Sequence, residues 1–113
     1  MMEFRFMGTE WQMRNEETLV SGTTGKQVMF IFDDSWEDVA RIAVFVAGTV
    51  CRTVELLGNY VAIPHEVLAQ PGRRLYVGVY GIDDDGFIRP TQMIPGPWIE
   101  FGADPTLDPG YTG

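Results

Sequence analysis

Residues 73–82 read RRLYVGVYGI, and this stretch decides the fold class. In an extended chain successive side chains point to opposite faces. Leu75, Val77 and Val79 therefore share one face, while Tyr76 and Tyr80 share the other. The apolar face predicts a β-strand packed on a core, with the two tyrosines turned outward.

Working outward from this strand, other short segments show the same period of two. Residues 26–32 are apolar on both faces, which is typical of a central strand, and 39–47 and 49–56 form a hairpin at Gly48. Residues 83–86 (DDDG) predict a hairpin turn, and 64–70 predict one helical turn that begins at Pro64. The remaining predicted strands are 3–6, 60–63, 87–89 and 98–101.

Residues 39–47 place Ala40, Ile42, Val44 and Val46 on one face and Arg41, Ala43 and Phe45 on the other. Between 87–89 and 98–101, Pro90, Pro95 and Pro97 lack the N–H group that a sheet ladder needs. We expect that stretch to be an edge strand or a crossing loop.

Seven or eight short strands, with no long helical pattern between them, predict an all-β fold. We expect a two-sheet antiparallel β-sandwich that is immunoglobulin-like in architecture only, with one short helical turn. Residues 1–103 would form this single domain. Residues 104–113 contain little to bury and would form a flexible C-terminal tail or linker.

Composition argues against several classes of partner. The chain has 113 residues, 16 of them acidic and 8 basic, with a formal net charge of -8. Binding to nucleic acid needs basic side chains that neutralise phosphates, so we expect no nucleic-acid partner. The first residues lack the apolar stretch of a secretory signal, and the longest apolar run is far shorter than the ~20 residues that span a bilayer. We therefore expect neither standard export nor a membrane partner.

The residues that could carry chemistry are few. His65 and Cys51 are the single histidine and the single cysteine, so neither a histidine zinc site nor a disulfide within the chain is expected. A Cys51–His65 nucleophile pair lacks an orienting partner, and residues 21–26 (SGTTGK) fail the phosphate-loop pattern at both ends. Asp83 and Asp85 leave a loose calcium site as an alternative to a solvated turn. We predict a protein that is not an enzyme, with no catalytic residue, metal or cofactor.

Aromatic residues are the remaining candidates. Trp36 lies within the acidic turn of residues 33–38 and could cap one end of the sandwich. Tyr76 and Tyr80, neighbours on one strand face, could form a platform for a sugar. Aromatic side chains in a small sandwich are more often core or subunit contacts, and we favour that interpretation.

Several segments in a fixed order carry a family resemblance over roughly residues 20–105. They are 32–38 (FDDSWED), 43–45 (AVF), 63–68 (IPHEVL), 71–72 (PG), 75–81 (LYVGVYG) and 99–103 (IEFGA). Together they resemble the N-terminal domain of tail-associated or baseplate-associated structural proteins encoded in prophages of Gram-positive bacteria. Such proteins typically continue into a longer distal region, whereas this sequence ends at Gly113.

The resemblance implies a non-enzymatic attachment or assembly module of a phage tail, assembled in the bacterial cytoplasm and located in the virion. Its partners would be other phage structural proteins, with a homo-oligomer as an alternative. We expect the interface to use Trp36, Trp98, Tyr76 and Tyr80 as aromatic anchors. The rival hypothesis is a carbohydrate-binding module that recognises a bacterial surface polysaccharide through Tyr76 and Tyr80. An enzyme that uses paired carboxylates is a third.

Overall fold

Alternating sequence gives a chain made almost entirely of strands. The structure is a computed structural model, and it describes residues 1–8 and 10–103. Within these residues there are ten strands, one short α-helix and one turn of 3-10 helix. In chain order they are β1 (Glu3–Met7), β2 (Glu10–Arg14), β3 (Leu19–Val20), β4 (Gln27–Phe32), η1 (Asp34–Trp36), β5 (Ala40–Ala47), β6 (Val50–Glu55), β7 (Tyr60–Ala62), α1 (His65–Leu68), β8 (Arg74–Ile82), β9 (Ile88–Pro90) and β10 (Ile94–Glu100).

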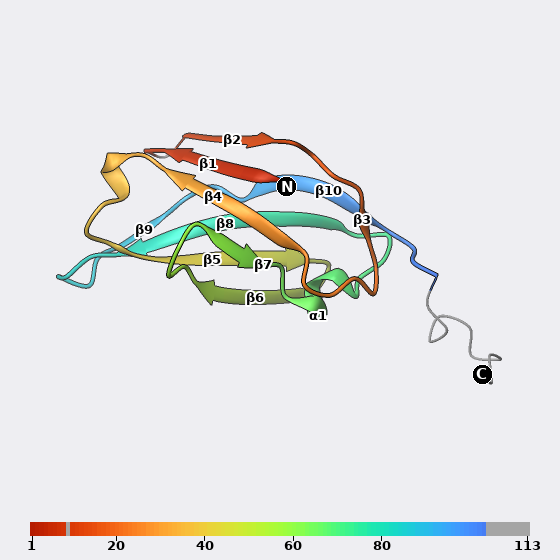
Figure 1. Ribbon diagram of the computed structural model, residues 1–113. Coiled ribbons are helices and arrows are strands. Elements are labelled where there is room, and N and C mark those ends of the chain that lie inside the picture. Colours follow the sequence, from red (N-terminus) through yellow and green to blue (C-terminus); the bar gives the residue numbers. More distant parts are fainter. Residues whose placement is uncertain (9, 104–113) are drawn as a thin grey trace.

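The strands form two sheets that pack face to face (Figure 1). The smaller sheet has the order β2-β1-β4-β7, and the larger has the order β3-β10-β8-β5-β6, with β9 paired to β8. The longest pairing joins β5 and β8 in antiparallel register from Ala40↔Ile82 to Ala47↔Leu75. The predicted two-sheet sandwich is therefore confirmed.

The core between the sheets is rich in phenylalanine. On the smaller sheet Phe4 and Phe30 stack with ring centroids 5.6 Å apart. Phe45 from β5 meets Phe30 edge-to-face at 6.1 Å, which joins the two layers. All three side chains are fully buried. Because Phe45 points inward, the alternate residues of β5 must point away from the smaller sheet.

The turns follow from their sequences. Gly48 has a φ of 59°, a conformation that glycine adopts without strain, and it closes the tight β5–β6 hairpin. The predicted turn at residues 83–86 is confirmed: the Asp83 carboxylate accepts hydrogen bonds from the backbone N–H groups of Asp85 (3.0 Å) and Phe87 (2.9 Å). The predicted helical turn after Pro64 is confirmed as α1.

Two details of the predicted fold need correction. The described residues form ten strands rather than seven or eight, because β2 and β3 were not expected. The pairing is also not purely antiparallel, since β1 pairs with β4, and β3 with β10, in parallel. Between β1 and β4, and again between β3 and β10, the chain passes through at least one strand of the other sheet before it returns.

The proline-rich stretch becomes strand β10. Pro95 pairs with Tyr76 of β8, and the register shifts before Trp98, which pairs with Arg74. Such a shift is a β-bulge, which bends the strand and interrupts the ladder. Among the described strands, β3 pairs with β10 only at Ile99 and Glu100. Over Ile94–Trp98 β10 is therefore an edge strand, as predicted. Proline is tolerated there because the unpaired side of an edge strand needs no ladder hydrogen bond.

Two further sequence-based expectations concern residues 104–113 and membrane-spanning segments. The predicted tail at residues 104–113 lies outside the described residues. Among the residues that are described, no helix has the length and apolar character needed to cross a membrane.

Candidate interaction surface: the outer face of the large sheet

The larger sheet has one face turned away from the smaller sheet, which we call the outer face. Strand register assigns its members, because residues paired across an antiparallel ladder point to the same side. These are Ala40, Ile42, Val44 and Val46 of β5; Cys51, Thr53 and Glu55 of β6; Arg74, Tyr76, Gly78, Tyr80 and Ile82 of β8; Ile88 and Pro90 of β9; and Pro95 and Trp98 of β10.

Apolar side chains on the outer face lie in rows across the strands. Val46 lies opposite Tyr76, which lies opposite Pro95. Ile42 lies opposite Tyr80, which in turn lies opposite Pro90. Directly paired side chains have Cβ atoms about 4.5–5.5 Å apart, so each row is a continuous contact. No second layer of the described chain covers these rows in the two-sheet arrangement (Figure 1).

The centre of the face is filled by a methionine. A Cβ atom placed on Gly78 would come within 2.5 Å of the Met93 sulfur, so the Met93 side chain lies directly over this glycine. Tyr80 pairs with Pro90 and Val77 pairs with Ile94, which leaves one extra residue on the β9–β10 side. This bulge carries Met93 onto the outer face, and 38% of the Met93 side chain stays exposed.

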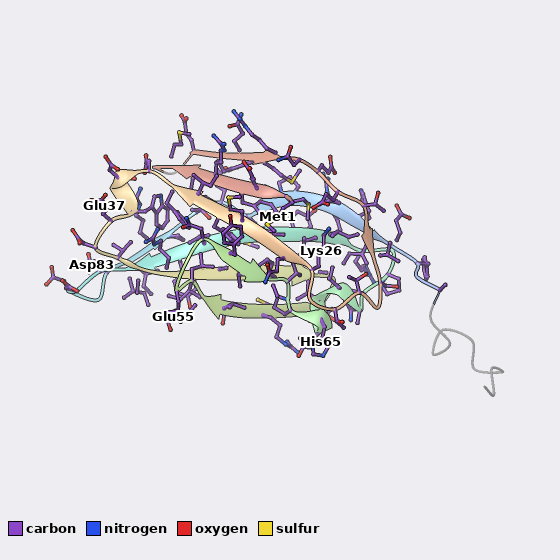
Figure 2. All side chains as sticks on the ribbon, viewed as in Figure 1. Met1, Lys26, Glu37, Glu55, His65 and Asp83 are labelled. Atoms are coloured by element: carbon purple, nitrogen blue, oxygen red, sulfur yellow. The ribbon has the colours of Figure 1, made fainter. Side chains whose placement is uncertain are left out.

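The outer face carries little charge compared with the chain as a whole. Among its assigned members only Glu55 and Arg74 are charged, in a chain with a net charge of -8. The Nε atom of Arg74 donates a hydrogen bond to the carbonyl oxygen of Gly96 at 2.8 Å. Its guanidinium carbon lies 6.0 Å from the centre of the Trp98 ring. Other acidic side chains, such as those of Glu37 and Asp83, lie at the end of the sandwich that carries η1 and the turn after β8 (Figure 2).

Three of the four predicted anchors lie on the outer face. Trp98 is 58% exposed and Tyr76 is 39% exposed, and they lie near each other because Trp98 pairs with Arg74, two residues before Tyr76. Tyr80 is half-buried and lies at the opposite end of the face, in the row with Ile42.

The fourth predicted anchor, Trp36, needs correction. Its side chain is fully buried, so it cannot contact a partner at the surface of the folded domain. The Nε1–H of Trp36 donates to the carbonyl oxygen of Gly8 at 3.0 Å, and the ring packs on Phe6 and Phe32. Its alternative predicted role, to cap the end of the sandwich, agrees with this buried position at the end of η1.

The candidate chemical residues are not gathered into a site. Cys51 is exposed on β6, and His65 is exposed at the start of α1, where its Nδ1 atom lies 3.6 Å from the Glu66 carboxylate. Among residues 1–8 and 10–103 no group of three or more His, Cys, Asp or Glu side chains is arranged to hold a metal ion. The carboxylate of Asp83 is engaged by its own turn.

The acidic turn before β5 is likewise structural. Asp33 caps η1. Its carboxylate accepts hydrogen bonds from the hydroxyl of Ser35, which has the larger effect, and from the backbone N–H of Ser35, and these bonds hold the pKa of the Asp33 carboxyl below its usual value. The Arg89 guanidinium adds to this effect and donates to the carbonyl oxygen of Ser35. The turn is therefore tied to β9 rather than open to a cation.

Sequence reasoning missed the aliphatic part of the outer face. Ile42, Val44 and Val46 were placed on one side of their strand, but either side of residues 39–47 could have been the buried one. Which side of β5 is buried follows from the inward position of Phe45, and that position is known only when β5 is paired with β8. Met93 was also missed, since the bulge that turns it outward leaves no pattern in the sequence.

Comparison of the chain with known proteins finds no matching family model, no matching curated protein and no matching solved structure. The outer face is therefore the feature from which a function can be argued.

Proposed function

We propose that the protein is a non-enzymatic assembly module of a phage tail or baseplate, and that it docks onto another virion structural protein through the outer face. The proposal combines the ordered segments that resemble prophage tail proteins with the properties of this face. The observation that carries it is an apolar sheet surface left without a covering layer, with Tyr76 and Trp98 exposed on it.

The outer face has the composition of an interface rather than of an ordinary solvent-facing sheet. A sheet with one face in water normally alternates apolar and polar residues. Here β5 places Ile42, Val44 and Val46 on the side away from the core. Contiguous exposed apolar surface commonly marks a site of protein interaction, and the core of an interface is depleted in charge and enriched in aromatic residues. All three properties occur on this face.

The saccharide hypothesis is the second candidate for the same face. Tyr76 and Tyr80 do lie on one side of β8, as a stacking platform would require. However, Gly78 lies between them, and the Met93 side chain covers it. The two rings are therefore separated by a flexible apolar side chain instead of forming one flat surface, which favours a protein partner.

The direct test is the composition of assembled particles. In a bacterial strain that carries the gene, prophage induction and purification of the released particles should yield the chain as a fixed tail component by quantitative mass spectrometry. Absence of the chain from intact tailed particles, with the chain present in the lysate, would remove the proposal. Binding of the isolated chain on a glycan array that is lost on Tyr80→Ala would favour the saccharide candidate instead.

A further inference from the structure

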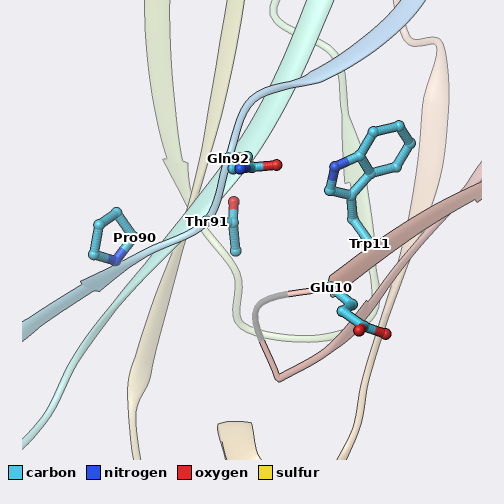
Figure 3. Close-up of a pocket in the computed structure, with 5 residues that line it drawn as sticks. All are labelled: Glu10, Trp11, Pro90, Thr91 and Gln92. Carbon is cyan, nitrogen blue, oxygen red and sulfur yellow. The ribbon is translucent and has the colours of Figure 1, made fainter.

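A groove lies at one open edge of the sandwich, beside the outer face. It has a volume of about 700 Å³ and is lined by Glu10, Trp11, Pro90, Thr91 and Gln92. One wall is β2, the edge strand of the smaller sheet, and the other is the connection from β9 to β10 (Figure 3). Its volume is within the ~300–1,000 Å³ range of small-molecule sites.

Trp11 forms the aromatic wall of the groove. It pairs with Phe6 across β1 and β2, and Phe6 is fully buried, so the Trp11 ring lies on the face of the sheet that points toward the other layer. Because β2 is the last strand of its sheet, the ring overhangs the edge of the core and stays 38% exposed. A large planar indole is thus presented to the groove from a paired strand.

The opposite wall supplies groups that form hydrogen bonds. Thr91 is fixed on β8: its N–H donates to the carbonyl oxygen of Val79 at 2.8 Å, and its Oγ1 atom accepts from the N–H of Val79 at 3.0 Å. Since that oxygen is used as an acceptor, the hydroxyl proton remains available to donate. Gln92 is exposed beside it and points toward Trp11, with an amide that both donates and accepts (Figure 3).

The lining groups select a class of ligand. The five lining residues include neither Lys nor Arg, so an anion would find no opposite charge among them. A purely apolar ligand would cover the polar side chains of Thr91 and Gln92 without satisfying them. Sites for quaternary ammonium groups surround the cation with several aromatic faces, whereas this groove presents one.

We propose that this groove binds a neutral saccharide, with one sugar ring stacked on the Trp11 indole and its hydroxyl groups bonded to Thr91 and Gln92. A pyranose ring has an apolar face of C–H groups and a rim of hydroxyls, which matches one aromatic wall opposed by short polar side chains. Of the five lining residues, Pro90 alone also belongs to the outer face, and this inference does not depend on the assembly proposal.

The experiment is a titration of the full ¹⁵N-labelled chain followed by NMR. The chain contains three tryptophans, so three indole N–H signals report on the groove (Trp11), the core (Trp36) and the outer face (Trp98). The probes are neutral tetrasaccharides of glucose, galactose and N-acetylglucosamine. At least one should shift the Trp11 indole and the Gln92 amide, with a Kd of about 0.1–10 mM as expected for an open groove, and leave Trp36 and Trp98 unchanged.

Variants make the result specific. Trp11→Ala should raise the Kd by about tenfold or more, because it removes the stacking surface, and Gln92→Ala should raise it by about threefold. Trp98→Ala is the matched control, since it removes an exposed indole on another face and should leave the Kd unchanged.

Three outcomes would overturn the inference. The first is that no tetrasaccharide shifts the Trp11 indole at about 10 mM while the spectrum is that of the folded chain. The second is that tetramethylammonium shifts it and the sugars do not. The third is that Trp98→Ala, rather than Gln92→Ala or Trp11→Ala, removes the response.

Discussion

The Trp36 indole is held on every side, which explains why it is a core residue rather than an anchor for a partner. Its ring centre lies 5.4 Å from that of Phe32, and the Arg89 guanidinium carbon lies 4.3 Å from it on another side. Gly81 leaves room for it, since a Cβ atom there would come within 3.2 Å of the ring. The indole N–H is satisfied by Gly8, so no polar group is buried without a partner.

We expect Trp36→Ala to lower the free energy of unfolding by about 3–5 kcal/mol, because it leaves a large cavity and removes the contacts with two aromatic rings. Urea denaturation followed by circular dichroism measures this. Trp98→Ala is the control: its side chain is 58% exposed, and the expected change is within about 0.5 kcal/mol. Equal losses for the two variants would contradict the assignment of Trp36 to the core.

The burial of Trp36 could not be predicted from its neighbours in the sequence. It lies in a run of acidic residues, 33–38, which indicates an exposed turn. Phe32 lies close by in the sequence, but Phe6 and the gap at Gly81, which complete the burial, come from strands β1 and β8 that are distant in the sequence.

At the level of elements, the short parallel pair β3–β10 holds the end of β10 against the sandwich. Leu19 pairs with Ile99, and both side chains are buried. The pairing continues through hydrogen bonds from the Ser21 N–H to the carbonyl oxygen of Glu100 (2.8 Å) and from the Gly102 N–H to the Ser21 hydroxyl (3.0 Å). The backbones approach so closely that position 102 has no room for a side chain.

Gly102→Ala should therefore destabilise the domain by about 1–3 kcal/mol, the usual cost of forcing extra atoms into a packed site. A Cβ atom at this position would lie 2.1 Å from the backbone oxygen of Ser21, so the two segments must separate. Thermal unfolding by calorimetry gives the change. Gly58→Ala serves as the matched control, since nothing lies within 4 Å of its Cβ position. Similar transition temperatures for both variants would show that β3 and β10 are not held as described.

The sequence predicted most elements because each carries its own alternation. The eight predicted strand segments correspond to described strands, although residues 98–101 covered only the end of β10. The two missed strands have physical reasons for being missed. Strand β3 has only two residues, so its extended shape comes from pairing with β10 rather than from a local pattern. Strand β2 alternates at Trp11 and Met13, but charged and polar neighbours leave it exposed along most of its length.

At the scale of the whole molecule, the two faces of the larger sheet have different surroundings. One face packs Phe45, Leu75 and Val77 into the core, and the other presents Val44, Val46 and Tyr76 to the surface. Sequence alternation correctly placed Tyr76 and Tyr80 outward. It could not show that β5 would add an aliphatic surface beside them, because that depends on which layer covers which side of the sheet. A continuous apolar surface of this kind is thus visible only once the sandwich is assembled.

The central claim is that the outer face is buried when the protein joins a larger particle. The measurement is the amount of tagged chain in purified particles, by quantitative mass spectrometry, for Val44→Glu and for Gln27→Glu. Val44 lies at the centre of the outer face, and Gln27 is exposed on β4 of the other sheet, so each variant adds the same charge to a different sheet. Thermal unfolding of the isolated variants checks that both are folded.

If the outer face is the docking surface, the Val44→Glu chain should be reduced by about tenfold or more relative to the Gln27→Glu chain, since a buried unpaired carboxylate costs more than ~1.4 kcal/mol. Equal incorporation of the two folded variants would contradict the claim.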